Sequence, residues 1–273
     1  MAGSTWRADT PDPRLSLAHK SPLWAASMTA MFRGMILLFA MGAGAWALTM
    51  ADGAAQSNPF DRLVSSQTGR AEPSVWYDRA DGRGRFVFDR SAEPALLWPD
   101  GAQEVVALYR ASAAGGGDIW VNDTEKVVLR VSRIGGWTFF PDDRPDGVAV
   151  EPMGRAHTLV AAPANNAQVQ TAAREMADRL ARLSRQNVRA ELAAPAPDQN
   201  AYIIDTMAMV TLAAEQASRR SLRNLETVRI GVGETPRASF DGRTLDISVD
   251  TARGYGGRPS AAYIRRALEQ GGG

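Results

Sequence analysis

Carboxylates are the side chains most able to do chemistry in this sequence, because cysteine is absent and histidine occurs only twice. The lack of cysteine excludes thiolate nucleophiles, disulfide frameworks and Cys-ligated metal sites. A pair of carboxylates at a suitable distance can hydrolyse a glycosidic bond. Aspartates cluster near expected hairpin ends, namely Asp118, Asp123, Asp142, Asp143 and Asp146. Of these, Asp118, Asp142 and Asp143 are the catalytic candidates, although a role in forming the turns is favoured.

His157 is a further catalytic candidate, because it is the one histidine outside the N-terminal segment and could act as an acid or base. It lies in Ala156–Val160, which alternates like a strand, and no nucleophile motif accompanies it. A structural or surface role is therefore favoured. Asp205 lies among apolar residues near the start of an expected helix. Its burial could raise its pKa for function, but the positive end of the helix favours a structural role.

No cofactor or metal is predicted. One remaining histidine excludes multi-His metal sites, and the spacing of Asp142, Asp143 and Asp146 does not fit a calcium loop. The glycines of 231–233 and 254–257 lack the further residues of a phosphate-binding loop. The chain has 31 basic and 30 acidic side chains, and this balance argues against a nucleic-acid partner.

Residues 1–55 predict a signal peptide with a long N-terminal region. Met35–Met50 is uncharged over its whole length, and the small residues Gly53-Ala54-Ala55 provide a cleavage site. Either Met28 or Met31 could be the true start of translation. The protein is therefore expected in the periplasm or cell envelope.

The alternative is an anchor that stays in the inner membrane. The uncharged stretch from Gly34 to Ala51 approaches the ~20 residues needed to span a bilayer. In that case Met35–Met50 provides the only membrane contact. Cleavage is favoured because the length and the flanking residues fit a signal peptide better.

Residues 56–72 are polar without a period and predict a flexible tether. Residues 73–162 contain short apolar runs separated by turn dipeptides, which is typical of an antiparallel β-meander, either a small barrel or a sandwich. Strands are expected at Val75–Tyr77, Arg85–Asp89, Pro94–Trp98, Val105–Arg110, Ile119–Val121, Val127–Ser132, Trp137–Phe140 and Ala156–Val160. Trp76, Trp98 and Trp120 are spaced by 22 residues, which we interpret as a repeated hairpin length. These tryptophans are expected to pack in the β-rich part rather than to form a ligand platform.

Residues 163–273 predict an α+β part that packs on the meander. Helices are expected at Asn166–Gln186, from Asp198 or Asn200 to Leu222, and at Ser260–Glu269. Strands are expected at Val188–Leu192, Thr227–Val232 and Ala238–Val249, the last with a hairpin turn at Asp241-Gly242. Together the two parts predict the α+β class, with helices on one face of a sheet.

Asp118–Phe140 reads DIWVNDTEKVVLRVSRIGGWTFF and is followed by Asp142–Val148. With Phe60–Leu63 and Phe88–Ser91, this pattern resembles a family of uncharacterised bacterial exported proteins that is known as a domain of unknown function. The resemblance implies export and a shared fold, and it supplies no activity.

The sequence favours a non-catalytic binding or scaffold protein of the cell envelope, whose partner is an envelope protein or ligand. The basis is the predicted signal peptide and the lack of a catalytic constellation. Two alternatives stay open. One is a carboxylate-dependent hydrolase of cell-wall glycan, and the other is a membrane-anchored subunit of an envelope complex.

Overall fold

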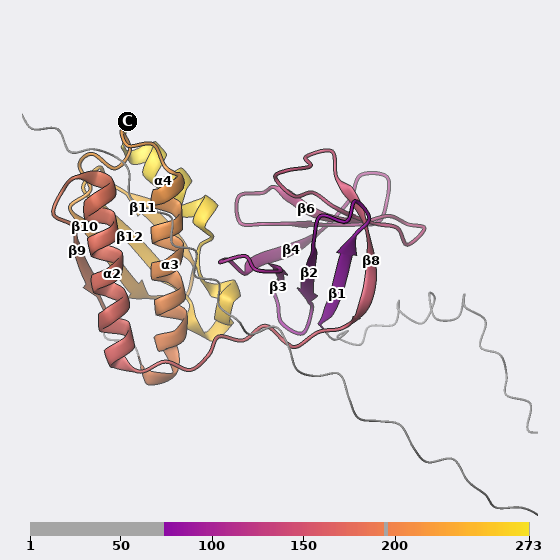
Figure 1. Ribbon diagram of the computed structural model, residues 1–273, viewed down its shortest axis with the longest axis horizontal. Coiled ribbons are helices and arrows are strands. Elements are labelled where there is room, and N and C mark those ends of the chain that lie inside the picture. Colours follow the sequence, from indigo (N-terminus) through magenta and orange to yellow (C-terminus); the bar gives the residue numbers. More distant parts are fainter. Residues whose placement is uncertain (1–73, 194–195, 273) are drawn as a thin grey trace, which may run out of the picture. The chain divides into compact units, whose positions relative to one another are not determined.

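The computed structural model describes residues 74–193 and 196–272 (Figure 1). The predicted signal peptide of residues 1–55 and the tether of residues 56–72 lie outside these residues. None of the helices in the described part is both long enough and apolar enough to cross a membrane. The β-rich part and the α+β part belong to one compact unit.

The β-rich part is a closed antiparallel barrel of eight strands, each paired with the next along the chain. This confirms the predicted meander and selects the barrel over the sandwich. The first four strands are β1 (Val75–Arg79), β2 (Arg85–Asp89), β3 (Ala95–Pro99) and β4 (Val106–Ser112). The others are β5 (Asp118–Val121), β6 (Val127–Val131), β7 (Trp137–Phe139) and β8 (Val148–Arg155).

The strand that closes the barrel, β8, was not predicted. It pairs with β7 on one side and with β1 on the other. Pro152 lies within it, opposite an irregularity in the register between Trp76 and Tyr77. A proline interrupts strand hydrogen bonding, so the sequence pattern does not indicate a strand here. The strand expected at Ala156–Val160 is wrong, because the chain leaves the barrel after Arg155.

Side chains fill the inside of the barrel. Tyr77 stacks on Phe86 with ring centroids 5.4 Å apart, and Phe86 packs on Phe139 at 4.6 Å. The buried residues of this core are Tyr77, Phe86, Phe88, Ala95, Leu97, Leu108, Val128, Leu129, Phe139, Val148 and Val150. Because an eight-stranded barrel is just wide enough for its own side chains, bulky aromatics leave a packed core rather than a channel.

The tryptophan spacing follows the hairpin repeat, as expected. Trp76, Trp98 and Trp120 lie on β1, β3 and β5, which are two strands apart in each case. They do not share one environment. Trp120 packs edge-on against Phe88 of the core, whereas Trp76 and Trp98 pair with Val87 from opposite sides. Because side chains alternate along a strand, Val87 and Phe88 point to opposite faces of the barrel wall.

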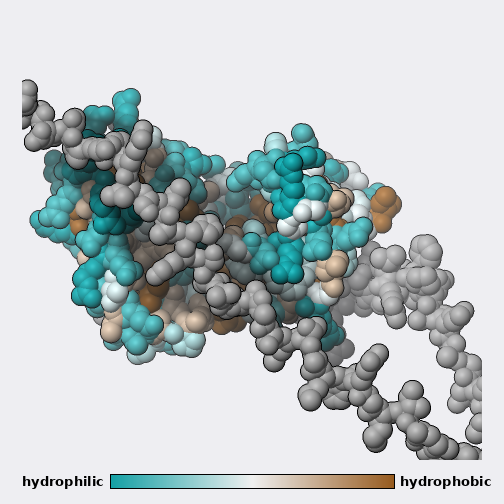
Figure 2. Space-filling view, in the orientation of Figure 1, coloured by the Kyte–Doolittle hydropathy of each residue, from teal (hydrophilic) through white to brown (hydrophobic). Residues whose placement is uncertain are grey.

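The two ends of the barrel carry different connections, because neighbouring antiparallel strands run in opposite directions. One end holds the start of β1, the end of β8 and the connections β2–β3, β4–β5 and β6–β7. We call it the Ile134 end, after the residue in the β6–β7 hairpin turn. The other four connections between strands lie at the opposite end. They are β1–β2, β3–β4, β5–β6 and β7–β8. Figure 2 shows a mostly hydrophilic surface with hydrophobic surface projecting from the barrel on the right of the view.

The α+β part is a four-stranded mixed sheet of order β11-β12-β10-β9, with helices on one face (Figure 1). Its strands are β9 (Arg189–Leu192), β10 (Thr227–Val232), β11 (Arg237–Phe240) and β12 (Thr244–Val249). The α-helices are α2 (Asn166–Ser184), α3 (Asn200–Gln216) and α4 (Ala261–Gly271), and short 3-10 helices occur at Pro197–Gln199 (η2) and Thr251–Gly257 (η3). The predicted α+β class is therefore confirmed.

The helix starts follow local signals. Asn165 caps α2 in a reciprocal pair with Gln168, and Ser260 caps α4. The predicted end of the second long helix at Leu222 is wrong, because α3 ends at Gln216. Beyond it the Ser218 hydroxyl accepts a hydrogen bond from the Ser221 backbone N–H, which supports turns instead of helix.

The sheet and its helices enclose a second core, separate from that of the barrel. Its fully buried members include Leu180, Ile203, Val228, Leu245 and Ile264. Alternate residues of the strands face away from the helices and are polar. Arg229 on β10 bridges Glu191 at 3.0 Å and Asp246 at 2.7 Å on this open face.

Candidate functional site

The three aspartates that the sequence offered for catalysis do not come together. Asp118 begins β5 at the Ile134 end and accepts a hydrogen bond from Arg110 at 2.7 Å. Asp142 and Asp143 lie in the β7–β8 loop at the opposite end. The Asp143 carboxylate accepts two hydrogen bonds from Arg79, at 3.0 and 3.1 Å, and this guanidinium lowers the pKa of Asp143. The two ends of the barrel thus separate Asp118 from the other two candidates.

His157 lies just beyond β8, with an exposed side chain. Its backbone carbonyl accepts a hydrogen bond from the Ser74 hydroxyl at 2.9 Å, which links the two chain segments that flank the barrel. The histidine thus contributes to structure through its backbone, and its imidazole faces solvent.

Asp123, in the β5–β6 turn, makes a long-range contact that the sequence did not indicate. Its carboxylate accepts hydrogen bonds from the backbone N–H of Ser260 at 2.7 Å and from the Ser260 hydroxyl at 2.6 Å. Ser260 is the N-cap of α4, so a barrel turn supports the start of a helix in the α+β part.

A buried arginine links the barrel to the α+β part. The side chain of Arg258 is 1% exposed and forms ion pairs with Asp205 of α3 and with Glu104, the latter at 3.6 Å. It also donates a hydrogen bond to the backbone carbonyl of Val105 at 3.0 Å. Glu104 and Val105 precede β4, so this guanidinium contacts both parts of the fold.

Burial controls the protonation of the two carboxylates beside Arg258. It raises the pKa of Glu104 and of Asp205, while the positive charge of Arg258 acts in the opposite direction. The pKa of Tyr255 is raised by burial as well, and its ring lies 5.7 Å from the Arg258 guanidinium carbon. A shifted pKa marks either a functional site or a structural ion cluster.

The contacts of this cluster fit a structural role. Glu104 also accepts a hydrogen bond from the Ala261 backbone N–H at 3.0 Å, so both carboxylates are engaged by protein groups. Within the part of the chain that the structure describes, no group of three or more potential metal-ligating side chains occurs. We infer that the cluster stabilises the contact between barrel and helix layer. The sequence favoured a structural role for Asp205 for another reason, the positive end of its helix. Sequence analysis missed Arg258 and Glu104, whose partners lie up to 157 residues away.

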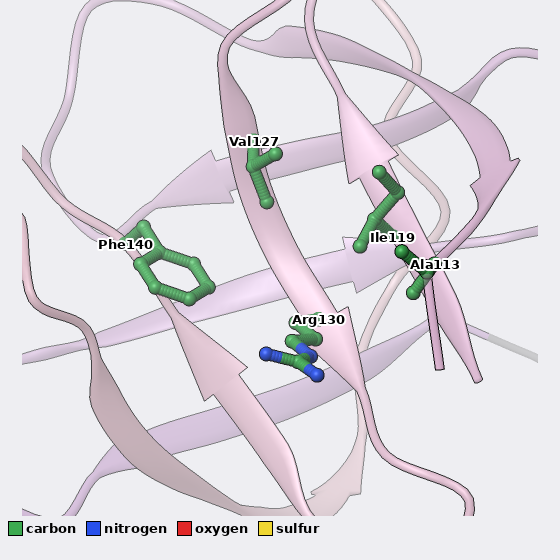
Figure 3. A pocket seen from close by; sticks show the side chains of 6 residues that line it. Ala113, Ile119, Val127, Arg130 and Phe140 are labelled. Carbon is green, nitrogen blue, oxygen red and sulfur yellow. The ribbon is translucent and has the colours of Figure 1, made fainter. Parts of the chain in front are cut away.

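A hollow on the outer wall of the barrel has the composition of a binding site. It measures about 320 Å³ and is lined by Ala113, Ala114, Ile119, Val127, Arg130 and Phe140. Figure 3 shows the Arg130 guanidinium between the side chains of Phe140 and Ile119, with Val127 beyond it. The lining is apolar except for this one positive charge.

Strand register explains why Arg130 lies in the wall. Arg130 of β6 pairs with Ile119 of β5 and with Thr138 of β7, whereas its neighbour Leu129 pairs with Trp120 and points into the core. Among the described residues, no carboxylate lies within ion-pair distance of Arg130, in contrast to Arg79 and Arg110. The hollow therefore offers apolar contacts together with an arginine that can bind an anion.

Sequence analysis did not identify this hollow. Its residues come from two strands, β5 and β6, and from the connections that follow β4 and β7, and each of them alone is typical of a β-hairpin. The available signal was an arginine within the otherwise apolar run Val127–Val131.

The comparison with protein families covers both parts of the structure. A model of a domain of unknown function, DUF4908, matches residues 59–268. The chain belongs to the DUF4908 family. The match includes the whole barrel and nearly all of the α+β part, so both are components of the DUF4908 domain. Searches of curated proteins and of solved structures found no match.

Proposed function

We propose that this DUF4908 protein is exported to the periplasm or cell envelope and acts there as a non-catalytic binding protein. Its ligand would be an amphiphilic anion, with an apolar chain and a phosphate or carboxylate group. The observation that carries the proposal is the apolar hollow with Arg130. An arginine fork recognises phosphate and carboxylate oxygens, and the surrounding apolar side chains suit a hydrocarbon chain.

Two further observations support binding rather than the hydrolysis of cell-wall glycan. Asp118 and Asp143 are each held by an arginine, at different ends of the barrel. Glu104 and Asp205, whose pKa burial raises, both contact Arg258. Glycoside hydrolysis needs two carboxyl groups about 5–9.5 Å apart on either side of a substrate.

Export is tested on the natural protein. N-terminal sequencing after cell fractionation is expected to show an envelope protein that begins at Gln56, or one that keeps Met35–Met50 as an anchor. An unprocessed protein in the cytosol would refute the export part of the proposal. The third reading, a membrane-anchored subunit, requires the uncleaved form.

Ligand binding is tested with dodecyl phosphate below its critical micelle concentration. Residues 56–273, which contain both cores, are titrated by calorimetry, and amide NMR shifts are expected around Ile119 and Phe140. Arg130→Ala is expected to weaken binding at least about tenfold, because a hydrogen bond to a charged group contributes roughly 1.5–3 kcal/mol. The matched control is Arg144→Ala, an exposed arginine at the opposite end of the barrel. Equal affinity of the Arg130 and Arg144 variants would contradict the site.

A further inference from the structure

Three of the four large hydrophobic side chains that are exposed belong to strand ends and connections at one end of the barrel. The large hydrophobic residues that are exposed are Ile134 at 96%, Val160 at 67%, Met153 at 62% and Val232 at 44%. Single exposed apolar residues are ordinary, whereas a group of them marks an interaction surface. Three of these four belong to the Ile134 end, and only Val232 lies on the mixed sheet.

The positions of the three residues follow from the strand connections. Ile134 occupies the β6–β7 turn, which the hydrogen bond from the Gly135 N–H to the Ser132 carbonyl closes. Met153 lies in the last part of β8, and β8 pairs with β7 next to that turn. The Leu159 N–H donates to Asp89 at the end of β2, and this contact places the neighbouring Val160 at the same end.

The same end is basic. Its segments 89–94, 110–118, 130–136 and 153–160 contain five arginines and three carboxylates, one of which is the buried Asp89. The β4–β5 and β6–β7 turns lie against each other, because the Arg133 side chain approaches Gly116. Arg130, in the hollow between the same two hairpins, brings its charge close to this surface.

The opposite end has the reverse charge. Its segments 79–85, 99–105, 121–127 and 140–148 contain eight carboxylates and five basic side chains, but Glu104 and Asp123 bind groups of the α+β part, so this end is partly covered. The barrel therefore has one exposed end that is basic and apolar, and one end that the α+β part partly covers. Exposed apolar residues among arginines suit the boundary of a bilayer with anionic headgroups.

The chain outside the described residues joins the barrel at this same end. Ser74 precedes β1, and residues 51–73 separate it from the uncharged segment that ends at Met50. A stretch of this length spans up to about 80 Å when extended, since each residue contributes roughly 3.3–3.6 Å. An anchored form could therefore place the Ile134 end on the bilayer surface, and a cleaved form would have to bind by this end alone.

We propose that the Ile134 end docks on a bilayer that contains anionic phospholipid, with Ile134 and Met153 in the interface and with Arg130 and Arg133 on headgroup phosphates. This inference rests on the proposed function, because it names the amphiphilic anion as a phospholipid within a membrane. The hollow at Arg130 is then the place where one lipid headgroup is held.

The test is co-sedimentation of residues 56–273 with vesicles. Vesicles of phosphatidylcholine with 30% phosphatidylglycerol are expected to bind the protein, and vesicles of phosphatidylcholine alone are expected to bind it at least about tenfold less. Raising the salt to 0.5 M is expected to weaken binding, because it screens charges at the surface. Equal binding to both kinds of vesicle would overturn the proposal.

Variants locate the surface. Ile134→Asp and Arg133→Glu are each expected to reduce vesicle binding at least about tenfold, and both side chains are exposed, so that folding is preserved and can be checked by circular dichroism. Arg144→Glu at the opposite end and Val232→Ser on the mixed sheet are matched controls that are expected to bind like the parent protein. If the controls weaken binding as much as Ile134→Asp does, the docking surface is wrong.

The outcome separates this inference from the proposed function. Binding of dodecyl phosphate at Arg130 without binding of anionic vesicles would refute the docking surface and leave the binding function in place. Failure of both ligands would refute both.

Discussion

Replacing Arg258 by methionine tests whether the buried ion cluster holds the two parts of this DUF4908 protein together. The substitution keeps an unbranched side chain of similar length and removes the charge. It leaves Asp205 and Glu104 without their cation and the Val105 carbonyl without its donor. Both carboxylates already have a raised pKa because of burial, and the loss of Arg258 removes the charge that opposes this.

The expected cost is large. Removing one partner of a buried ion pair typically destabilises a protein by about 3–5 kcal/mol. This is a substantial part of the roughly 5–15 kcal/mol by which a domain is stable. Since 1 kcal/mol shifts the melting temperature of a 150–250-residue protein by about 2–4 °C, we expect a decrease of about 6–20 °C.

The assay is urea unfolding of residues 56–273, followed by tryptophan fluorescence and by far-UV circular dichroism. All the tryptophans of the described residues lie in the barrel, and its transition can therefore be separated from that of the helices. The parent protein is expected to show coincident transitions. In Arg258→Met the two signals are expected to separate, because a contact between the barrel and α3 is lost.

The raised pKa of Glu104 and of Asp205 determines how the destabilisation by Arg258→Met changes with pH. A carboxyl group whose pKa is raised in the folded state binds protons more tightly there, so the folded state gains stability as the pH falls toward the unfolded pKa of about 4. Without Arg258 this gain becomes larger. The destabilisation by Arg258→Met is therefore expected to be smaller at pH 5 than at pH 7.

The matched control is Arg229→Met. Arg229 also bridges two carboxylates, Glu191 and Asp246, but its side chain is 54% exposed on the open face of the sheet. Exposed ion pairs contribute little because water screens them, and we expect almost no change in stability. If Arg258→Met and Arg229→Met had equal effects, or if the effect of Arg258→Met were the same at both pH values, our account of the buried cluster would be wrong.

Three other predictions concern the supports of the fold. Ser260→Ala removes the N-cap of α4 and the hydroxyl that donates to Asp123. Chemical denaturation is expected to show that the free energy of unfolding falls by about 0.5–2 kcal/mol. An unchanged free energy of unfolding would mean that the cap is dispensable. The guanidinium of Arg79 lowers the pKa of Asp81 and Asp143. The stabilisation of the fold by these ionised carboxylates is therefore present above the unfolded pKa of about 3.9 and is lost as the pH falls through the folded pKa. Acid titration of the parent and of Arg79→Met is expected to show that the pH dependence of their stability differs only at low pH. Gly117→Ala introduces a Cβ at a φ of +94° against a backbone carbonyl of β6. We expect thermal unfolding to show a loss of stability of more than about 1 kcal/mol. A melting temperature equal to that of the parent would contradict this expectation.

Local signals in the sequence predicted most elements of the fold. The helix from Asn166 was correct at its start because Asn165 and Gln168 form a cap within four residues. The hairpins around Trp98 and Trp120 were correct because alternation and turn residues lie within one short window. β8 was missed because its pairing depends on β1, which lies more than 70 residues earlier, while its own Pro152 argues against a strand.

The candidate sites show the same limit. The aspartates beside the hairpins were found, but their sequence spacing did not indicate that Asp118 and Asp143 lie at opposite ends of a barrel. Asp205 was found through its apolar neighbours, whereas its partner Arg258 lies 53 residues later. The sequence did not indicate Arg130 as a site residue, because the hollow around it is formed by side chains of neighbouring strands and connections.

The sequence by itself determined the chemistry that is absent, the alternation of strands and turns, the helix caps and the uncharged N-terminal segment that predicts export. These properties depend on residue types and on neighbours within about one turn or one hairpin. The tertiary structure alone decided the closure of the barrel by β8, the burial of Arg258 between two carboxylates, the hollow at Arg130 and the placement of Ile134 and Arg133 at one exposed end of the barrel. Each of these depends on which strands become neighbours, and that choice is made by the packing of the whole chain.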